Sequence, residues 1–393
     1  MNVLVEHGFE ANYTIGFARG LAANGVMLVV LSSDETEGRL SSAGIRNVNI
    51  RGRQTDSRSI SEKFLNLSRY YLKLLLFVVR NRGGTFHLTG MFRNELILFD
   101  GLVLNVFFRI FARRYIYTAH NVLPHNREGS NFLRWVYRLI YCVPHVIVVH
   151  TQETRRTLIE RFGVPDAKIR VISIGLNEEV PATRLTRQES RSRLGCDSAA
   201  KLILFFGRVD EYKGVDVLIE AFDRLEMPET RLVIAGAFRS PRYRERILTG
   251  IACARRQADI RLEARLIPNE EVGVFFGASD VVCLPYRNIY QSGLLFLAMR
   301  FGKPIVTTNV GSLAEFVTPD TGLIAESNDA EGIANALAAF FASPGRFREE
   351  RILAEGEKYR WNRVCQALIP LYEAGVATGA TPPSHFPSDT VYP

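Results

Sequence analysis

Two cations flank a short glycine-containing segment that follows the apolar run Leu202–Phe206. The segment reads FGRVDEYKG, includes Arg208 and Lys213, and leads directly into a helical pattern. Gly207 at a strand end lets a ligand approach the backbone closely, and the first amides of a helix attract anions. Two fixed cations beside such a helix suit a diphosphate. A surface turn is the alternative interpretation of this string.

Two further polar turns also connect an apolar run to a helical pattern. The first is LPYRNIYQSGLL, in which Ser292 can cap the following helix and Gly293 leaves its first amides open to an anion. The second is TNVGSLAE, which ends on the acidic residue Glu315. Three loops of one kind, each at a strand end, favour a common binding site.

The first predicted strand ends on His7 and Gly8. An imidazole has a pKa near neutrality and can accept the proton of an attacking hydroxyl group. Glu6 and Glu10 are the alternative bases in this segment.

Other histidines accompany the later strands of the first half. His120 follows the strand predicted over 115–119, in the segment TAHNVLPH that ends at His125. A histidine at a strand end is either structural or functional, and both interpretations stay open for His125. His145 and His150 flank an apolar strand, and we interpret them as core or supporting residues.

The elements that must position these residues follow an alternating pattern, which is typical of parallel sheets covered by helices. Predicted strands cover 2–7, 26–32, 85–88, 115–119, 145–150, 169–174, 202–206, 231–235, 280–284 and 304–308. Predicted helices cover 12–24, 60–81, 92–112, 131–142, 152–162, 213–224, 242–256, 270–277, 292–301, 329–342 and 360–374. Ligands of such sheets bind at the carboxyl ends of the strands, where the polar loops lie.

The length of 393 residues fits two α/β domains, each with a doubly wound, Rossmann-like sheet. We predict an N-terminal domain over 1–180, a polar linker over 181–200 and a C-terminal domain over 201–359. A last helix is expected over 360–375. The tail over 376–393 is rich in Pro, Ser, Thr and Gly, which predicts disorder.

The positive charge is concentrated in the first half of the chain. Residues 1–180 contain 23 Lys and Arg and 15 Asp and Glu, whereas residues 181–393 contain 26 of each. Such an excess fits nucleic acid, an anionic membrane, an anionic small molecule or a solubilising surface. Because no nucleic-acid-binding motif accompanies it, no nucleic-acid partner is expected.

The five cysteines are far apart and form no CxxC pair, so we interpret them as core thiols of a reducing compartment. No signal-peptide pattern precedes the first strand, and a cytoplasmic location is expected. No Asp-x-Asp signature accompanies the loops, so neither a metal nor another cofactor is expected.

Two helical segments of the first half are unusually apolar. Residues 69–82 read RYYLKLLLFVVRNR, and residues 94–114 carry four polar or charged side chains inside an otherwise apolar run. The second is a poor transmembrane candidate, and a buried core helix explains most of the pattern. Basic flanks beside aromatic residues also fit peripheral contact with the inner face of an anionic cell membrane.

The three loops in this order resemble the nucleotide-sugar domain of GT-B glycosyltransferases, and most closely that of glycosyltransferase family 4. The similarity runs from about residue 200 to Tyr372 and, more loosely, over the first half. It implies two Rossmann-like domains facing each other across a cleft. The helix from Trp361 to Tyr372 resembles the family's closing helix, which crosses back to the first domain.

The resemblance assigns roles to single residues. Arg208 and Lys213, with Ser292 and Gly293, match the positions that hold the donor diphosphate. His120 matches a histidine that contacts the donor sugar or the leaving phosphate. The remaining donor contacts implied for the nucleotide and the sugar are Gly207, Gly236, Phe238, Ile267, Tyr286, Gln291 and Glu315. Core packing is the alternative interpretation of Phe238 and Ile267. Gly8 and His125 fall on the acceptor side, and His7 matches the general base of inverting relatives.

One part of the sequence departs from the family pattern. Retaining members carry two glutamates eight positions apart, and the corresponding positions here are Ile289 and Leu297. The Gln-Ser-Gly found here resembles a subset of bacterial exopolysaccharide-type enzymes. The stereochemical outcome therefore stays open between retention and inversion.

The implied activity is metal-independent transfer of a hexose-type sugar from a UDP- or GDP-sugar. The implied acceptor is a glycan or a polyprenyl- or glycolipid-linked sugar in surface polysaccharide or glycolipid biosynthesis. A GT-B nucleotide-sugar epimerase and a non-catalytic donor-binding or scaffold subunit are the alternatives.

Overall fold

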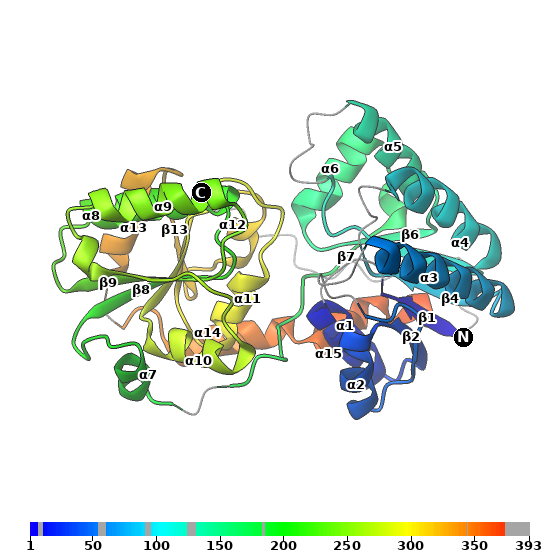
Figure 1. Cartoon of the computed structure of the whole chain (residues 1–393), viewed down its shortest axis with the longest axis horizontal. Coiled ribbons are helices and arrows are strands. Elements are labelled where there is room, and N and C mark those ends of the chain that lie inside the picture. Colours follow the sequence, from blue (N-terminus) through cyan, green and yellow to red (C-terminus); the bar gives the residue numbers. More distant parts are fainter. Residues whose placement is uncertain are drawn as a thin grey trace.

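The computed structural model describes residues 1–6, 11–53, 60–90, 96–123, 131–182, 185–343 and 345–373. Two entirely parallel sheets form separate α/β domains, as Figure 1 shows. The N-terminal sheet has seven strands in the order β3-β2-β1-β4-β5-β6-β7, and the C-terminal sheet has six in the order β10-β9-β8-β11-β12-β13. Both orders reverse direction beside the first strand of the domain, which is the doubly wound topology expected from the sequence.

The central N-terminal strands are largely apolar and buried on both faces, because helices cover the sheet from both sides. The strands are β1 (Asn2–Val5), β2 (Leu28–Ser32), β3 (Asn47–Asn49), β4 (Thr85–Leu88), β5 (Arg114–Thr118), β6 (Val146–Val149) and β7 (Ile169–Val171). The helices are α1 (Ala11–Ala23), α2 (Asp34–Ser42), α3 (Ile60–Arg80), the π-helical turn η2 (Phe99–Leu104), α4 (Asn105–Phe111), α5 (Asn131–Cys142) and α6 (Gln152–Phe162). Two separate hydrophobic clusters pack on this sheet, one with α1 and α2 and the other with α3 to α6.

The C-terminal domain repeats this plan around one large core. Its strands are β8 (Lys201–Phe206), β9 (Thr230–Ala235), β10 (Ile260–Glu263), β11 (Val281–Leu284), β12 (Ile305–Thr307) and β13 (Gly322–Ile324). Its helices are α7 (Arg187–Arg193), α8 (Val215–Arg224), α9 (Pro241–Cys253), α10 (Asn269–Ala278), α11 (Gly293–Arg300), α12 (Leu313–Phe316), α13 (Ala330–Phe341) and α14 (Glu349–Gly356). Helices α8, α9 and α13 lie on one side of the sheet, and α7, α10 and α14 lie on the other (Figure 1).

Three strands that the pattern did not predict are β3, β10 and β13. Each forms an edge of its sheet and is only partly buried. Because an edge strand packs against fewer neighbours, its sequence needs fewer apolar residues and gives a weaker signal.

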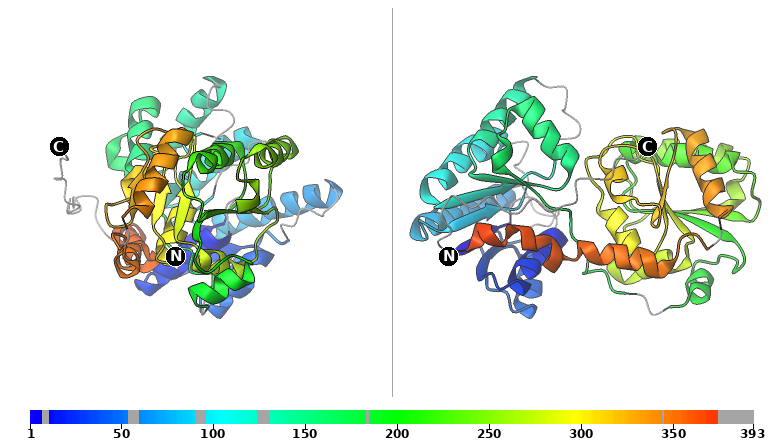
Figure 2. Two further views of the ribbon diagram at one scale, coloured as in Figure 1. Left: turned by 90° about the vertical axis from the view of Figure 1, so that its left-hand side faces the viewer. Right: turned by 180° about the vertical axis from the view of Figure 1, so that it is seen from behind.

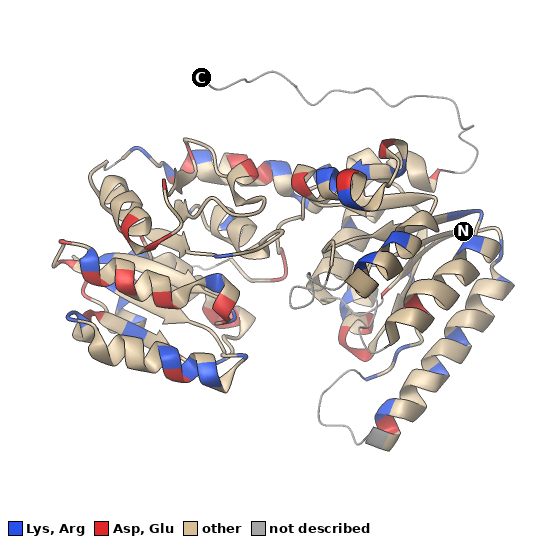
Figure 3. Ribbon diagram, turned by 90° about the horizontal axis from the view of Figure 1, so that it is seen from above, with Lys and Arg blue, Asp and Glu red and all other residues tan. Residues whose placement is uncertain are grey.

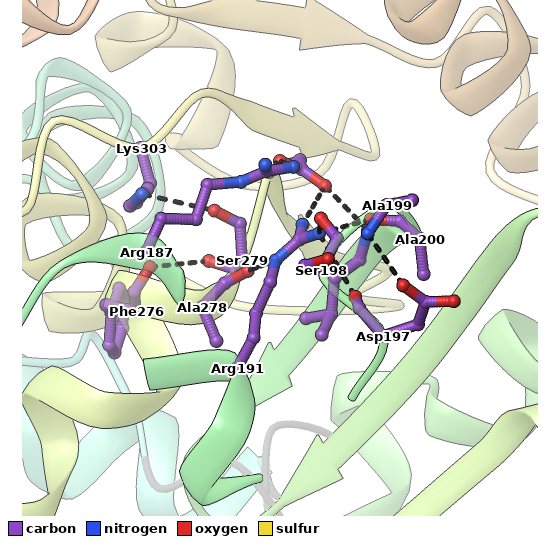
Figure 4. Close-up of polar contacts among 12 residues, drawn as sticks. Arg187, Arg191, Asp197, Ser198, Ala199, Ala200, Phe276, Ala278, Ser279 and Lys303 are labelled. Carbon is purple, nitrogen blue, oxygen red and sulfur yellow. Dashed lines mark hydrogen bonds and ion pairs between the residues drawn. The ribbon is translucent and has the colours of Figure 1, made fainter. Parts of the chain in front are cut away.

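Helix α7 lies inside the segment 181–200 that the polar composition predicted as a linker. Its Arg191 is buried, forms an ion pair with Asp280 at 2.7 Å, and donates to the carbonyls of Ala278, Ser198 and Ala200 (Figure 4). The helix therefore packs on the C-terminal domain. Composition alone did not predict this helix, because a buried arginine bound to carbonyl groups cannot be distinguished from a surface arginine in the sequence.

The segment from Trp361 to Tyr372 returns from the C-terminal domain and packs on the N-terminal one. Figure 2 shows it in red beneath the N-terminal sheet. It consists of α15 (Trp361–Val364), the 3-10 turn η7 (Cys365–Leu368) and α16 (Ile369–Tyr372), where one helix was predicted. Pro370 at the start of α16 has no N–H to continue a helix from the preceding turn. The predicted disordered tail lies outside the described residues.

The cysteines only partly follow the prediction of core thiols. Cys283 and Cys365 are buried, but Cys142 and Cys253 are exposed and Cys196 is half-buried; none forms a disulfide. Across the described segments, no helix has the length and apolar content needed to cross a bilayer.

Candidate active site

A cavity of about 500 Å³ lies between the two domains, where the carboxyl ends of both sheets face each other. Its N-terminal wall includes Asn12 and Tyr13 of α1 and His120 and Asn121 after β5. Its C-terminal wall is built from the loop after β8 and the loop before α11. Gly175 and Trp361 complete the lining where the chain passes between the domains. This is the position that the strand-end loops predicted.

The loop after β8 brings Arg208 and Lys213 to this cavity. Gly236 supports the loop from behind, because a Cβ atom there would lie 1.9 Å from the carbonyl oxygen of Gly207. The side chain of Phe238 packs on the core, while its backbone pairs with that of Val209. Gly236 and Phe238 therefore position the loop from outside the cavity lining.

Charges in the lining balance to a net value of +2 over the described residues. Arg208, Lys213 and Arg239 are the cations, and Asp210 is the one carboxylate. Arg239 lies 3.7 Å from Asp210, so this pair cancels. The remaining charge equals that needed to neutralise a diphosphate diester, which carries two negative charges.

The loop between β11 and α11 contributes Gln291, Ser292 and Gly293. Ser292 is the N-cap residue of α11, but its side chain makes no capping hydrogen bond, contrary to the sequence prediction. Its Oγ lies 3.3 Å from the hydroxyl of Tyr286 instead. Tyr286 is fully buried beneath the loop, with its ring 5.5 Å from Nζ of Lys213. It therefore supports the cavity wall from below. A Cβ atom on Gly293 would meet nothing within 4 Å, so the start of α11 is open.

An apolar strip crosses the C-terminal wall. It is formed by Ile289, Leu294 and Leu297, all of which line the cavity. Ile289 and Leu297 are the two positions where the family resemblance implies glutamates. The wall therefore offers hydrocarbon contact where a carboxylate would accept hydrogen bonds from hydroxyl groups.

The Gln291 amide connects the two walls. Its Nε2 donates to the backbone carbonyl of His120 at 3.1 Å. Its Oε1 is buried and has no hydrogen-bond donor among the described residues. Since a buried acceptor without a partner costs free energy, this oxygen is suited to a ligand hydroxyl.

His120 is 2% exposed and belongs to a buried network that the sequence did not reveal. Its Nε2 lies 2.7 Å from the carbonyl of Thr89, and its Nδ1 lies 3.2 Å from Nε2 of His150. Nδ1 of His150 lies 3.1 Å from the carbonyl of Ile172. Burial lowers the pKa of His120 well below its ordinary value, and burial lowers that of His150 to about 4.

Within the described contacts, this histidine pair presents four ring nitrogens to two carbonyl groups and to each other. Each of the two carbonyls requires an N–H group, and a third N–H is needed between the rings. Two neutral imidazoles supply only two, so an added proton would complete the network. Burial opposes that proton, whereas an anion in the cavity would favour it.

Several predicted site residues lie elsewhere. Glu315 does not reach the cavity lining; its carboxylate accepts from the backbone N–H groups of Gln152 and Glu153 at 3.1 Å and so contacts the start of α6 across the domain boundary. Ile267 is buried in the C-terminal core before α10. His7, Gly8 and His125 lie outside the described residues.

The main additions to the site are Tyr13, His150 and Trp361. Tyr13 contacts His120 edge-on, with ring centroids 4.6 Å apart, and contacts Trp361 at 5.1 Å. Tyr13 follows β1, so the same strand-end reasoning could have found it. His150 could not be found this way, since nothing in its own segment indicates contact with His120.

Comparison with known proteins matches both domains to glycosyltransferase families. A model described as glycosyl transferases group 1 matches residues 200–343, and one described as glycosyltransferase family 4 matches residues 11–180. A D-inositol 3-phosphate glycosyltransferase from Xylanimonas cellulosilytica is 29% identical over 239 residues, which are 58% of this chain and 56% of that protein. The chain thus spans little more than half the length of this curated relative.

Two solved structures share the fold. Sucrose-phosphate synthase from Thermosynechococcus elongatus superposes with a TM-score of 0.73 at 17% identity, covering 95% of this chain and 98% of that one. HepE from Anabaena, solved with UDP and glucose, gives a TM-score of 0.73 at 15% identity over 94% of this chain and 99% of that one. With one family matched in each domain and this architecture throughout, the chain belongs to the GT-B glycosyltransferases of group 1 and family 4.

Proposed function

We propose that the protein transfers a sugar from a nucleotide-diphosphate donor to a glycan or lipid-linked acceptor in surface polysaccharide or glycolipid biosynthesis. The observation that carries this proposal is the cavity between the domains, with Arg208 and Lys213 on one wall and His120 on the other. A relative named as a glycosyltransferase and a neighbour solved with UDP and glucose support the same activity.

The C-terminal wall is proposed to hold the donor diphosphate. Arg208 and Lys213 neutralise its two charges, and the open amides at Gly293 receive one of its oxygens at the start of α11. As the bond between the sugar and the diphosphate breaks, negative charge develops on the leaving diphosphate. Fixed cations stabilise this developing charge in a site that excludes water, so no metal is required for the step.

The boundary between the walls is proposed to hold the sugar. Gln291 Oε1 accepts a hydrogen bond from a donor hydroxyl, and His120 contacts the sugar or the leaving phosphate. The apolar strip of Ile289, Leu294 and Leu297 packs against the hydrocarbon face of the donor. The acceptor enters from the N-terminal side.

A thermal-shift screen with UDP-, GDP- and ADP-sugars tests donor binding, because a ligand that binds the folded state raises its melting temperature. We expect one nucleotide class to stabilise the protein and Lys213→Ala to weaken its binding by about 10- to 100-fold, the cost of a lost charge-assisted contact. Arg242→Ala, on the exposed surface of α9, is the matched control and should bind like the wild type.

Two incubations test the reaction class. One contains the donor alone, and the other contains the donor and an extract that supplies acceptors. Transfer that persists in EDTA supports the proposal. An isomerised nucleotide sugar would instead identify an epimerase, and tight binding without turnover would identify a donor-binding subunit. If Arg208→Ala and Lys213→Ala left transfer unchanged, the assigned site would be wrong.

A further inference from the structure

The most unusual surface of the molecule is the solvent-facing side of α3. Four apolar residues, Leu65, Leu72, Leu76 and Val79, recur at helical spacing and are 49%, 60%, 45% and 42% exposed. The opposite side of the helix packs on the sheet through Tyr70, Leu74 and Val78. Since the inward side already serves the core, the outward apolar stripe has no packing role in the described structure.

The neighbouring helices extend this apolar surface. Phe99 and Val103 of η2 and Val106 and Ile110 of α4 are between 38% and 69% exposed. Phe132 and Trp135 of α5 are each 57% exposed.

These helices pack side by side, so their stripes form one surface. The ring of Tyr71 on α3 contacts that of Phe99 on η2, with centroids 5.1 Å apart. The Asn105 side chain donates to the carbonyl of Ile140 on α5 at 2.9 Å. We call the solvent-facing side of α3, η2, α4 and α5 the α3–α5 face. Figure 3 shows helices of this domain that are uncharged, and so coloured tan, over most of their length, with Lys and Arg positions in blue between the uncharged stretches.

The charges on this face are almost all positive. Its basic residues and those of the adjoining turns, all of them exposed, are Lys63, Arg69, Lys73, Arg80, Arg82, Arg109, Arg113, Arg134 and Arg138. Among the described residues of α3 to α5, the acidic ones are Glu62 and Asp100. Asp100 is buried and accepts a hydrogen bond from Tyr71, so it adds no charge to the surface.

Two of the basic residues lie together at one end of the face. Arg82 and Arg113 line a shallow depression beside Ile110. Neither forms an ion pair within the described part of the chain. Two cations beside an exposed apolar side chain match a phosphate group attached to an acyl chain.

We propose that the α3–α5 face docks on an anionic lipid bilayer. Apolar side chains enter the boundary between headgroups and acyl chains, and the surrounding Lys and Arg side chains contact lipid phosphates. The large positive excess favours this occupant over a second copy of the chain, because two such faces would repel each other.

The orientation of the helices connects this surface to the active site, on the basis of the proposed function. In a parallel α/β sheet the covering helices run opposite to the strands, so the starts of α3 and η2 lie toward the cavity edge. Leu65 and Phe99 belong to these starts, whereas Arg80 and Arg82 lie at the far end. A lipid-linked acceptor held in the bilayer would therefore meet the protein near the cleft.

The test is flotation of the full chain with vesicles of phosphatidylcholine alone or with 30 mol% phosphatidylglycerol, a composition on the order of anionic cell membranes. We expect binding to the anionic vesicles only. Leu72→Ser with Leu76→Ser and Ile110→Ser should lower the partition coefficient at least tenfold. Arg80→Gln with Arg82→Gln and Arg113→Gln should lower it by about fivefold per removed charge and reduce its salt dependence.

The matched control carries Arg242→Gln, Arg244→Gln and Leu248→Ser on the exposed side of α9, and it should bind vesicles like the wild type. Donor-induced thermal shifts measured without lipid should be the same in all variants, which separates this proposal from the donor site and shows that the variants fold. Equal binding of the wild type to neutral and anionic vesicles, or unchanged binding of both face variants, would overturn the proposal. A dimer in lipid-free solution that Leu72→Ser and Leu76→Ser dissociate would assign the face to a second copy instead.

Discussion

The first half of the chain, residues 1–180, carries its whole positive excess, yet the cations that line the cavity come from residues 181–393, whose net charge is zero. In the C-terminal domain, charges form defined pairs: Asp216 binds Arg246 and Arg287, and Asp280 binds Arg187 and Arg191. The N-terminal wall instead offers buried residues such as His120 and Tyr13. The donor site that we propose therefore depends on two cations of one loop and not on the net charge of the domain that carries it.

The strongest test of this difference separates binding from turnover. We expect Arg208→Ala combined with Lys213→Ala to weaken binding of UDP or GDP by about 100-fold or more, because each removed contact to a charged group costs about 1.5–3 kcal/mol. His120→Ala should leave nucleotide binding within about threefold and lower the transfer rate. Calorimetric titration with the free nucleotide and initial-rate kinetics measure the two effects. If both variants lost nucleotide binding equally, the two walls of the cavity would not have separate roles in binding and turnover.

The second prediction concerns the crossing segment, which follows the C-terminal domain in sequence but belongs to the N-terminal core. Trp361 is 3% exposed and fills the space above Gly16 and Gly175. Trp361→Ala should lower the free energy of unfolding by about 3–5 kcal/mol, the usual cost of a large buried ring.

Urea denaturation followed by circular dichroism measures this loss. Leu353→Ala, at a partly exposed position of α14, is the control and should cost less. A loss confined to the C-terminal domain, detected by hydrogen exchange, would contradict the assignment of the segment.

The third prediction concerns acid. No histidine lies in residues 181–373, whereas the N-terminal domain buries His87, His120 and His150. Burial lowers the pKa of His87 to about 3 and that of His150 to about 4. Since the unfolded value is near 6.5, the unfolded state takes up protons first as the pH falls. The free energy of unfolding that the two neutral histidines contribute above pH 6.5 is therefore lost as the pH falls toward 4. At pH 5 the loss is about 2 kcal/mol for each of these two residues.

Trp361 is buried in the N-terminal core and Trp135 is an exposed residue of α5 in the same domain, so the change in tryptophan emission, which comes mainly from Trp361, follows the unfolding of this domain. We expect the urea midpoint from this signal to fall between pH 7 and pH 5, and His87→Phe to make the fall shallower. An equal pH dependence in wild type and variant would show that His87 is not the source.

The smallest expected effect lies at the contact between domains. Glu315 accepts two backbone hydrogen bonds at the positive end of α6, so Glu315→Gln should weaken this contact without removing it. We expect donor KM to rise about two- to fivefold, with no change for the control Glu326→Gln, an exposed residue of the same domain. A change above tenfold would indicate that Glu315 contacts the donor directly.

Much of this architecture was readable from the sequence because its signals are local. Buried parallel strands are continuous apolar runs, so Leu202–Phe206 and Val281–Leu284 could be placed directly. The edge strands β3 and β10 escaped prediction, since partial burial weakens the apolar pattern. Helix α7 escaped because its buried Arg191 pairs with Asp280, far away in the chain.

The sequence by itself determined the two-domain parallel α/β plan, the family, and the loop that carries Arg208 and Lys213, because each depends on residues close together in the chain. Only the tertiary structure decided that His150 lies against His120, that Gln291 reaches across to the other domain, and that Ser292 faces Tyr286 instead of capping its helix. It also decided that Leu65, Leu72, Leu76 and Val79 of α3 face outward while Leu74 and Val78 face the core. These facts depend on how separate elements pack, and packing joins side chains whose separation in the sequence carries no signal.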